Sequence, residues 1–268
     1  MKFKPHVTLV GAGPGDPELL TIKAVKAIQA ASVLLVDDLV SDEITAYASP
    51  LARVIRVGKR GGCKSTPQIF IEKLMIQEAL AGERVVRLKG GDPFIFGRGG
   101  EEVEHLQSQG IGVTIINGIT AGLAGITSLG VPLTHRLHAQ GVLFVTGHAK
   151  EGVEDAIDWC EIARVAAKAK LTIVIYMGVS EVENLERALL IGLNPDTPVA
   201  LIQNVSLPIQ RQALCTVKNL THTLRSNELS SPCVIVVGNV LLGFLQLEQQ
   251  KMHQLKCSHS KRNSLFTK

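Results

Sequence analysis

Residues 6–21 read HVTLVGAGPGDPELLT, an apolar run that passes directly into a glycine-rich turn and then into a helical stretch. The segment predicts a strand and, with the helix that follows, one parallel βα unit. Its glycines are separated by single residues, so the G-x-G-x-x-G spacing of dinucleotide-binding folds is absent. Asp16 followed by Pro17 instead fits an N-cap and a first helical position. The turn therefore suits close approach of a ligand to the backbone, but not clearly of a diphosphate.

The same alternation of strands and helices continues along the chain. Strands are expected at 6–10, 33–36, 54–57, 84–88, 113–116, 142–146, 171–178, 199–204, 212–217 and 234–237, and helices at 22–31, 69–81, 101–109, 121–129, 155–169 and 182–191. In the second half the apolar runs lie closer together, which permits antiparallel hairpins. We predict an α/β fold with two domains, 1–146 with a mostly parallel sheet and 147–245 with a mixed sheet, and a basic, disordered tail at 246–268.

Composition limits the possible partners. The 268 residues are 46% hydrophobic and can bury a large core. The formal charge of +4 comes from the tail, because five of the 28 Lys and Arg residues and one of the 24 acidic residues lie from Gln246 onward. The body is neutral, which argues against a nucleic-acid partner.

Cysteine usage and hydropathy indicate the compartment. The five cysteines form no CxxC pair and are odd in number, so we expect reduced thiols, and no His and Cys spacing predicts a metal site. No apolar run approaches the roughly 18 residues of a membrane helix, and no signal-peptide pattern opens the sequence. We expect a soluble cytoplasmic protein that does not bind a membrane.

The second predicted strand ends in VDDLVSDE, residues 36–43. Asp37 lies where a dinucleotide-binding fold holds a ribose hydroxyl, but the residue type also fits a general acid or base, or a solvated strand end. These three interpretations stay open on the local sequence alone.

The third predicted strand ends in RVGKRGGCK, residues 56–64, which places four cations at one glycine-containing turn. Such a cluster recognises carboxylates or phosphates, although a solvated cationic loop explains it equally well. The cations are Arg56, Lys59, Arg60 and Lys64.

Residues 84–102, RVVRLKGGDPFIFGRGGEE, form a strand, a long glycine loop and a helix start. Gly90 and Gly91 let a ligand reach the main chain, and Asp92 can accept a hydrogen bond from a ligand ammonium or hydroxyl. Ile95 and its neighbours offer an apolar wall, and Arg98 offers an anion contact. The absence of a G-x-x-x-x-G-K-[ST] run argues against a nucleoside triphosphatase.

Two further segments complete the candidate loops. NGITAGLAGI brings Thr120 and Ala121 to a helix start, and GVPLTHR brings His135 and Arg136 to a loop. His148 in VTGH fits a structural strand-end residue better than a base, because no nucleophile motif accompanies it.

The motifs together resemble those of the uroporphyrinogen-III C-methyltransferases, in the tetrapyrrole methyltransferase family. The resemblance spans Val7–Val240 and rests on GAGPGDPELLT, DDLVS, VGKRGG, VVRLKGGDPFIFGRGGEE, GITAG, VPLTHR, VTGH and VIYMG. It implies a homodimer of two-domain subunits, with S-adenosylmethionine in the cleft between the domains and no metal. Two methyl transfers would convert uroporphyrinogen III to precorrin-2.

The resemblance also implies roles for single residues. Asp37 would be the proton acceptor and Lys59 the proton donor. The cofactor would contact Pro14, Gly90, Gly91, Asp92, Ile95, Thr120, Ala121 and Met177, much of it through the backbone. Val205 would add a backbone contact, and the strand-end positions of Ala200 and Gly238 add these two residues to the cofactor set. The substrate is a polycarboxylate, which gives a purpose to the cations Arg56, Arg60, Lys64, Arg98 and Arg136.

Several positions depart from the family pattern. Val36 and Asn117 stand where Tyr and Pro are usual, Leu137 and His138 where Asp and Tyr are common, and Val205 replaces a glycine. The alternatives are a related precorrin methyltransferase and a non-catalytic tetrapyrrole-binding regulator. We expect a monofunctional enzyme whose product can feed siroheme, cobalamin or heme d1 synthesis.

Overall fold

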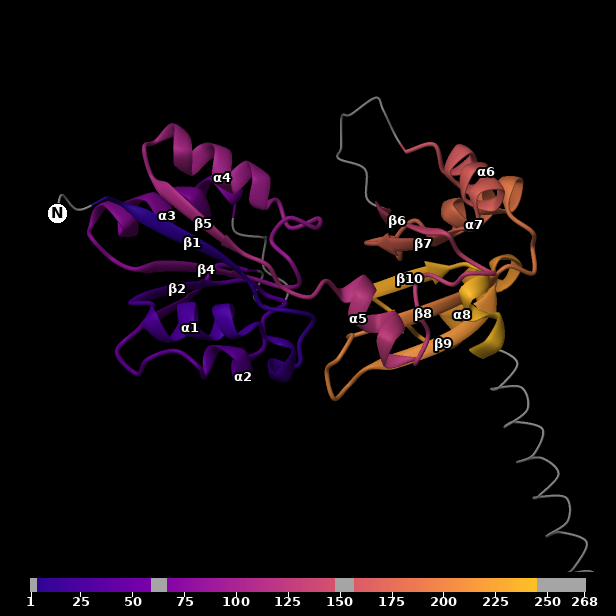
Figure 1. Cartoon of the computed structure of the whole chain (residues 1–268), viewed down its shortest axis with the longest axis horizontal. Coiled ribbons are helices and arrows are strands. Elements are labelled where there is room, and N and C mark those ends of the chain that lie inside the picture. The colour runs from indigo at the N-terminus through magenta and orange to yellow at the C-terminus, as the bar shows by residue number, and fades with distance from the viewer. Residues whose placement is uncertain (1–3, 59–66, 148–156, 245–268) are drawn as a thin grey trace, which may run out of the picture. The chain divides into compact units, whose positions relative to one another are not determined.

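The computed structural model describes residues 4–58, 67–147 and 157–244, which divide into two compact units (Figure 1). The first unit holds residues up to 124 together with 204–209, and the second holds 125–203 and the residues from 210 onward. The boundary therefore lies earlier than the predicted 146/147. The reason is that the strand at Gly141–Thr146 pairs with a strand of the second sheet.

The first unit contains a five-stranded parallel sheet in the order β3-β2-β4-β1-β5. Its strands are β1 His6–Gly11, β2 Val33–Val36, β3 Arg53–Arg56, β4 Val85–Lys89 and β5 Gly112–Ile116. β2 and β4 are buried along their whole length, as expected for strands covered on both faces. The mostly parallel sheet of the prediction is confirmed, and all its pairings are parallel.

Helices cover both faces of this sheet (Figure 1). One face packs on α1 Ile22–Ala30 and the short α2 Asp42–Thr45. The other packs on α3 Gln68–Leu80 and α4 Gly99–Ser108. β1 and β4 are neighbours in the sheet, but the helices that follow them cover opposite faces. In open α/β sheets, ligands bind at the carboxyl ends of strands where the connections diverge in this way.

The second unit contains a mixed sheet in the order β6-β7-β10-β8-β9, which confirms the predicted mixed sheet. Its strands are β6 Gly141–Thr146, β7 Leu171–Tyr176, β8 Pro198–Gln203, β9 Arg211–Thr216 and β10 Cys233–Val237. β6 and β7 are parallel, whereas β10 is antiparallel to both β7 and β8. Because β10 is antiparallel to β7, the last residues of β10 lie at the edge of the sheet where β7 begins.

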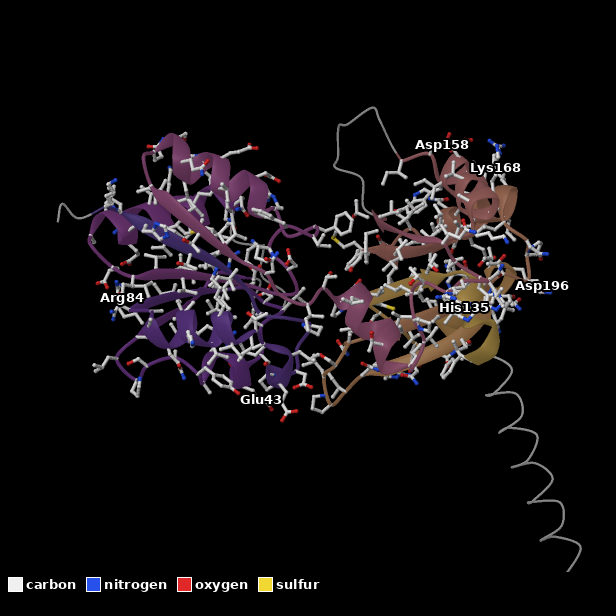
Figure 2. All side chains as sticks on the ribbon, in the orientation of Figure 1. Glu43, Arg84, His135, Asp158, Lys168 and Asp196 are labelled. Carbon is white, nitrogen blue, oxygen red and sulfur yellow. The ribbon has the colours of Figure 1, made fainter. Side chains whose placement is uncertain are left out.

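One face of the second sheet packs on α6 Trp159–Ala169, α7 Val182–Gly192 and α8 Leu220–Ser226. The α6 helix shows why these segments are helical: Asp158 caps its start by accepting from the backbone N–H of Glu161, and Lys168 lies in its last turn (Figure 2). α5 Ala121–Ser128 begins in the first unit and ends in the second. No helix within the described ranges is long and apolar enough to cross a membrane.

Candidate functional site

The loops that follow β1, β4 and β5 meet backbone to backbone. A Cβ atom on Gly11 would lie 2.4 Å from the backbone nitrogen of Gly118 and 2.7 Å from the carbonyl oxygen of Gly91. Gly13 and Gly91, both at positive φ, also exchange two backbone hydrogen bonds, with N···O distances of 3.1 and 2.7 Å. Only glycine permits this approach. We call these four residues the glycine junction.

Asp92 fixes the loop after β4 to the loop after β5. Its carboxylate accepts from the backbone N–H of Phe94 at 2.8 Å, from the backbone N–H of Gly118 at 3.1 Å and from the Asn117 amide at 3.2 Å. Three protein donors therefore bond to this carboxylate, one at Oδ1 and two at Oδ2. That it also accepts a hydrogen bond from a ligand stays a prediction.

Asn117 also gains a role here. The family pattern usually has Pro at this position, which has no side-chain donor, whereas the Asn117 amide bonds to Asp92. The departure adds a contact between two loops rather than removing one.

The segment at 204–209 belongs to the first unit and packs on the loop that contains Pro14. The Ser206 hydroxyl accepts from the backbone N–H of Asp16 at 2.9 Å, and a Cβ on Gly15 would lie 2.6 Å from the side chain of Leu207. Val205 is buried, with its carbonyl oxygen 3.4 Å from the position that the same Cβ would take. The structure therefore brings Val205 and Pro14, two predicted cofactor residues far apart in sequence, into one region.

Other predicted cofactor residues surround the glycine junction. Thr120 and Ala121 open α5, and the Cα of Thr120 would lie 3.8 Å from a Cβ on Gly91. Gly90 lies against Leu39 in the loop after β2, because its Cβ would fall 2.8 Å from that of Leu39. Ile95 keeps 37% of its surface exposed, so an apolar side chain is available beside these loops.

Asp37 lies directly after β2, and its backbone N–H bonds to the carbonyl of Leu88 on β4 at 3.1 Å. The side-chain Oδ1 accepts from Arg87 Nη2 at 2.8 Å. Arg87 is only 1% exposed, whereas the Asp37 side chain is 32% exposed. A buried cation thus holds a carboxylate that solvent and ligands can reach.

Arg87 belongs to a buried charge cluster, which we define as Asp37, Arg87, Lys89 and Glu102. The Glu102 Oε1 accepts from Arg87 Nε at 3.3 Å and from Lys89 Nζ at 3.1 Å. Burial lowers the pKa of the Lys89 ammonium and the Arg87 cation lowers it further, while Glu102 and Asp37 raise it. With all four groups ionised, two cations face two anions.

Sequence reasoning did not single out this cluster, although a signal was present. Arg87 and Lys89 lie two residues apart in an otherwise apolar strand, so both point to the same face of the sheet. That face packs on α4, which carries Glu102. Two cations that point to the same face of a buried strand need an acidic partner on the helix that covers this face.

The predicted substrate cations differ in their surroundings. Arg56 pairs with Asp42 and reaches the Val40 carbonyl, and Arg98 pairs with Glu101 at 3.1 Å from Nε to Oε1. Arg136 is exposed in the second unit, next to the bridge between His135 and Ala139. Lys59, Arg60, Lys64 and His148 lie outside the described residues.

The second sheet separates the remaining predicted cofactor residues. Met177 follows β7 at positive φ with 46% of its surface exposed, and Ala200 is fully buried in the middle of β8. Gly238 follows β10, but β10 runs antiparallel to β7, and the register places Val237 opposite Ile173 near the start of β7. Gly238 therefore lies at the opposite edge of the sheet from Met177, although both residues follow the last residue of a strand.

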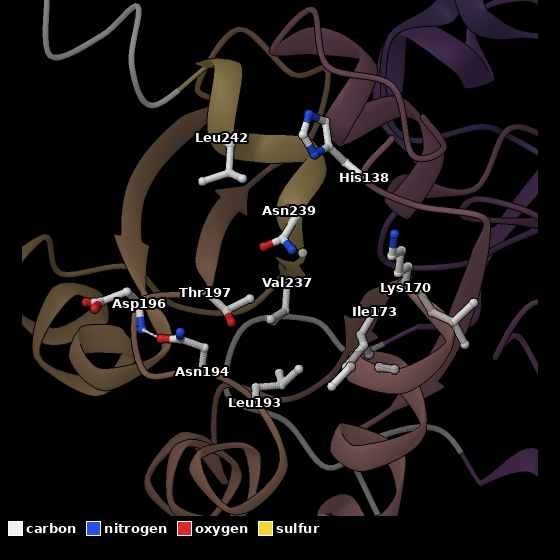
Figure 3. A pocket seen from close by; sticks show the side chains of 14 residues that line it. His138, Lys170, Ile173, Leu193, Asn194, Asp196, Thr197, Val237, Asn239 and Leu242 are labelled. Carbon is white, nitrogen blue, oxygen red and sulfur yellow. Dashed lines mark hydrogen bonds between the residues drawn. The ribbon is translucent and has the colours of Figure 1, made fainter. Parts of the chain in front are cut away.

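A cavity of about 370 Å³ lies at this opposite edge (Figure 3). Its lining includes Gly238 together with the polar side chains His138, Lys170, Asn194, Thr197 and Asn239. Ile173 and Val237 form part of its apolar floor. The cavity belongs to the second unit alone and contains none of the loops around the glycine junction.

Comparison with known proteins identifies the relatives of this chain. The family model for "Tetrapyrrole (Corrin/Porphyrin) Methylases" matches residues 6–221. The uroporphyrinogen-III C-methyltransferase of Pseudomonas aeruginosa is 50% identical over 235 residues, which cover 87% of this chain and 93% of that protein.

Two solved structures show the same architecture. A uroporphyrin-III C-methyltransferase from Thermus thermophilus, in complex with S-adenyl homocysteine, is 38% identical with a TM-score of 0.75 and covers 88% of this chain and 98% of that one. A cobalt precorrin-4 methyltransferase is 27% identical with a TM-score of 0.78, covering 88% and 95%. The fold is thus shared by methyltransferases with different substrates.

Proposed function

Because the chain belongs to the tetrapyrrole (corrin/porphyrin) methylases, we propose that it transfers two methyl groups from S-adenosylmethionine to uroporphyrinogen III, giving precorrin-2. The choice of uroporphyrinogen III as the substrate rests on the 50% identity to a uroporphyrinogen-III C-methyltransferase of nearly the same length. The Thermus complex with S-adenyl homocysteine supports the methyl donor.

The loops around the glycine junction fit such a cofactor. Gly90 and Gly91 remain partly exposed, which lets a ligand lie against their main chain, and Ile95 offers apolar surface for a flat ring. Pro14 lies on an adjoining loop, and Thr120 and Ala121 lie at the start of α5. When bound, the sulfonium supplies an already activated methyl group, so the protein's task is alignment and proton transfer.

Asp37 is proposed as the proton acceptor. Forming a bond from the methyl carbon to a ring carbon breaks the carbon–sulfur bond and leaves the ring with a proton to lose. The Asp37 carboxylate is exposed on one side and anchored on the other, as a general base needs. Lys59, outside the described residues, is proposed as the proton donor.

The cations Arg56, Arg98 and Arg136 are proposed to bind the substrate carboxylates, with Arg60 and Lys64 outside the described residues. Arg98 and Glu101 form an exposed pair, with 54% and 58% of their side chains accessible. Such pairs contribute only about 0–1 kcal/mol, so a substrate carboxylate can replace the acid at little cost. A homodimer and a cytoplasmic location are part of the same proposal.

The test is anaerobic incubation of the chain with S-adenosylmethionine and uroporphyrinogen III, followed by mass spectrometry of the tetrapyrrole. The proposal expects a doubly methylated product from the wild type and a loss of about 100-fold or more in rate for Asp37→Asn. Unmodified uroporphyrinogen III with methylation of a later precorrin would indicate a related precorrin methyltransferase. Methylation of neither substrate would indicate a non-catalytic tetrapyrrole-binding protein.

A further inference from the structure

Arg87 occupies a position in which a cation is costly. It lies in the middle of β4, opposite Leu9 on β1 and Leu35 on β2, and is 1% exposed. A buried guanidinium requires nearly all of its donors to be satisfied by charged or polar partners. Its partners therefore reveal what the side chain does.

The two ends of the guanidinium meet two different carboxylates. Nε donates to the fully buried Glu102, and Nη2 donates to Asp37 at 2.8 Å. Glu102 is itself held by Lys89 and by the Gln68 amide at 3.0 Å. The planar guanidinium is thus oriented from its buried side, and this orientation determines where Nη2 meets Asp37.

The hydrogen bond from Arg87 makes the two carboxylate oxygens of Asp37 different from each other. Oδ1 accepts from Arg87, while no residue in the described ranges donates to Oδ2. A carboxylate with one oxygen anchored and the other open presents a single, fixed acceptor. That is the geometry in which positioning contributes to a proton transfer.

Of the four groups in the cluster, Asp37 alone reaches the surface: its side chain is 32% exposed, against 2% for Arg87, 3% for Lys89 and 0% for Glu102. The cluster therefore holds Asp37 from inside the protein and leaves its outer side in contact with solvent.

We infer that Arg87, oriented by Glu102, is the positioning residue that holds Asp37 with one oxygen directed to the substrate. The inference rests on the proposed function, in which Asp37 accepts the proton. Arg87 acts through Asp37 and does not itself touch the reacting atoms.

The experiment is a double-mutant cycle between Arg87→Gln and Asp37→Asn, measured as kcat and as KM for S-adenosylmethionine. Arg87→Gln alone should lower kcat by about 100-fold with little change in that KM, and Arg87→Lys should recover about 10-fold of the loss. In the Asp37→Asn background, Arg87→Gln should change kcat by less than about twofold, because Arg87 affects catalysis only by positioning the Asp37 carboxylate, which this background lacks.

Lys89→Met is the matched control. It removes another buried cation of the cluster that bonds to Glu102 but not to Asp37, so it should lower kcat much less than Arg87→Gln at a similar loss of melting temperature. If Arg87→Gln does not fold, the same cycle is run with Arg87→Lys and the same non-additivity is expected.

The outcomes separate the two proposals. A wild type that methylates uroporphyrinogen III but shows the same fold-loss for Arg87→Gln in both backgrounds would overturn the role of Arg87 and leave the proposed function standing. A wild type without any such methylation would overturn both.

Discussion

The side-chain amide of Asn117 donates a hydrogen bond to the carboxylate of Asp92 at 3.2 Å, which joins the loop after β5 to the loop after β4. Asp92 is buried, and its other two donors are backbone N–H groups of the same loops. The two loops that carry most of the predicted cofactor residues are therefore held in one arrangement by a single carboxylate.

Replacing Asp92 should loosen both loops. Asp92→Ala leaves the backbone N–H groups of Phe94 and Gly118 without their acceptor, at a cost of about 2–3 kcal/mol in the free energy of unfolding. Asn117→Ala removes one donor and should cost about 1 kcal/mol. Urea unfolding gives both values, and calorimetric titration with S-adenosylhomocysteine should show weaker binding for Asp92→Ala.

Asn184→Ala is the control for this pair, because its amide bonds to the exposed Glu181 on the surface of the second unit. It should change stability by less than about 0.5 kcal/mol. Equal stability of Asp92→Ala and the wild type would show that the carboxylate does not hold the loops.

Much of this arrangement could be predicted from the sequence. The predicted bounds of β2 match the observed ones, and those of most other strands agree to within one residue, because their β-branched runs end sharply at glycines and polar residues. The long periodic helices are also predictable, whereas α2 and α8 are not, because four and seven residues are too short for a periodic signal. Hydrophobic pattern fixes local structure well.

Long-range relationships could not be predicted in the same way. The position of Gly238 at the end of the sheet away from Met177 could not be predicted, because the direction of a strand in its sheet cannot be deduced from that strand's own sequence and β10 is antiparallel to β7. The cofactor contact of Gly238 stays a prediction. The bond between Arg87 and Asp37 joins residues 50 positions apart, and it depends on β2 and β4 being neighbours in the sheet. Both facts come from topology rather than from any local motif.

The glycine junction should not tolerate a side chain. A Cβ on Gly118 would lie 2.2 Å from the carbonyl oxygen of Gly91, so Gly118→Ala forces backbone movement and should cost about 3 kcal/mol in the free energy of unfolding. Binding of S-adenosylhomocysteine should weaken in parallel, which calorimetric titration measures.

Gly100→Ala provides the matched control. Gly100 lies in α4 with no atom within 4 Å of the place that a Cβ would occupy, and alanine favours helix by up to about 1 kcal/mol. This variant should be as stable as the wild type or slightly more so. A Gly118→Ala protein with wild-type stability and binding would contradict the close contact of the three loops.

The exposed pair of Arg98 and Glu101 should compete with the substrate. Arg98→Ala should raise KM for uroporphyrinogen III by about 3–10-fold, because a charge-assisted contact is lost, while KM for S-adenosylmethionine stays the same. Glu101→Ala should lower KM for the substrate, since it frees the guanidinium.

Arg164 forms the same i,i+3 pair with Glu161 on α6, so Arg164→Ala controls for the loss of an exposed arginine. Steady-state kinetics should show no change for this variant. A fall in KM for Arg98→Ala, or no effect of Arg98→Ala at all, would remove Arg98 from substrate binding.

Cys233 should make the protein less stable in alkaline solution. Burial raises the pKa of its thiol from 9.0 to about 11, so the folded state keeps the proton at pH values where the unfolded state has lost it. The contribution is complete below pH 9 and is lost as the pH rises from 9 through 11, which amounts to at most about 2–3 kcal/mol.

Urea unfolding between pH 8 and pH 11 tests this dependence. The free energy of unfolding should fall less steeply with pH for Cys233→Ala than for the wild type. At pH 8 the free energy of unfolding of the variant should be lower than that of the wild type, because the substitution removes buried volume. Parallel slopes for the two proteins would show that the thiol does not contribute.

The measurement that tests the central claim most directly uses S-adenosylmethionine labelled with ¹³C in its methyl group. With uroporphyrinogen III as substrate, the account predicts two new labelled methyl groups bonded to ring carbons in the NMR spectrum and two equivalents of S-adenosylhomocysteine per porphyrinogen consumed. Unlabelled uroporphyrinogen III recovered after incubation with folded, cofactor-bound enzyme would contradict it.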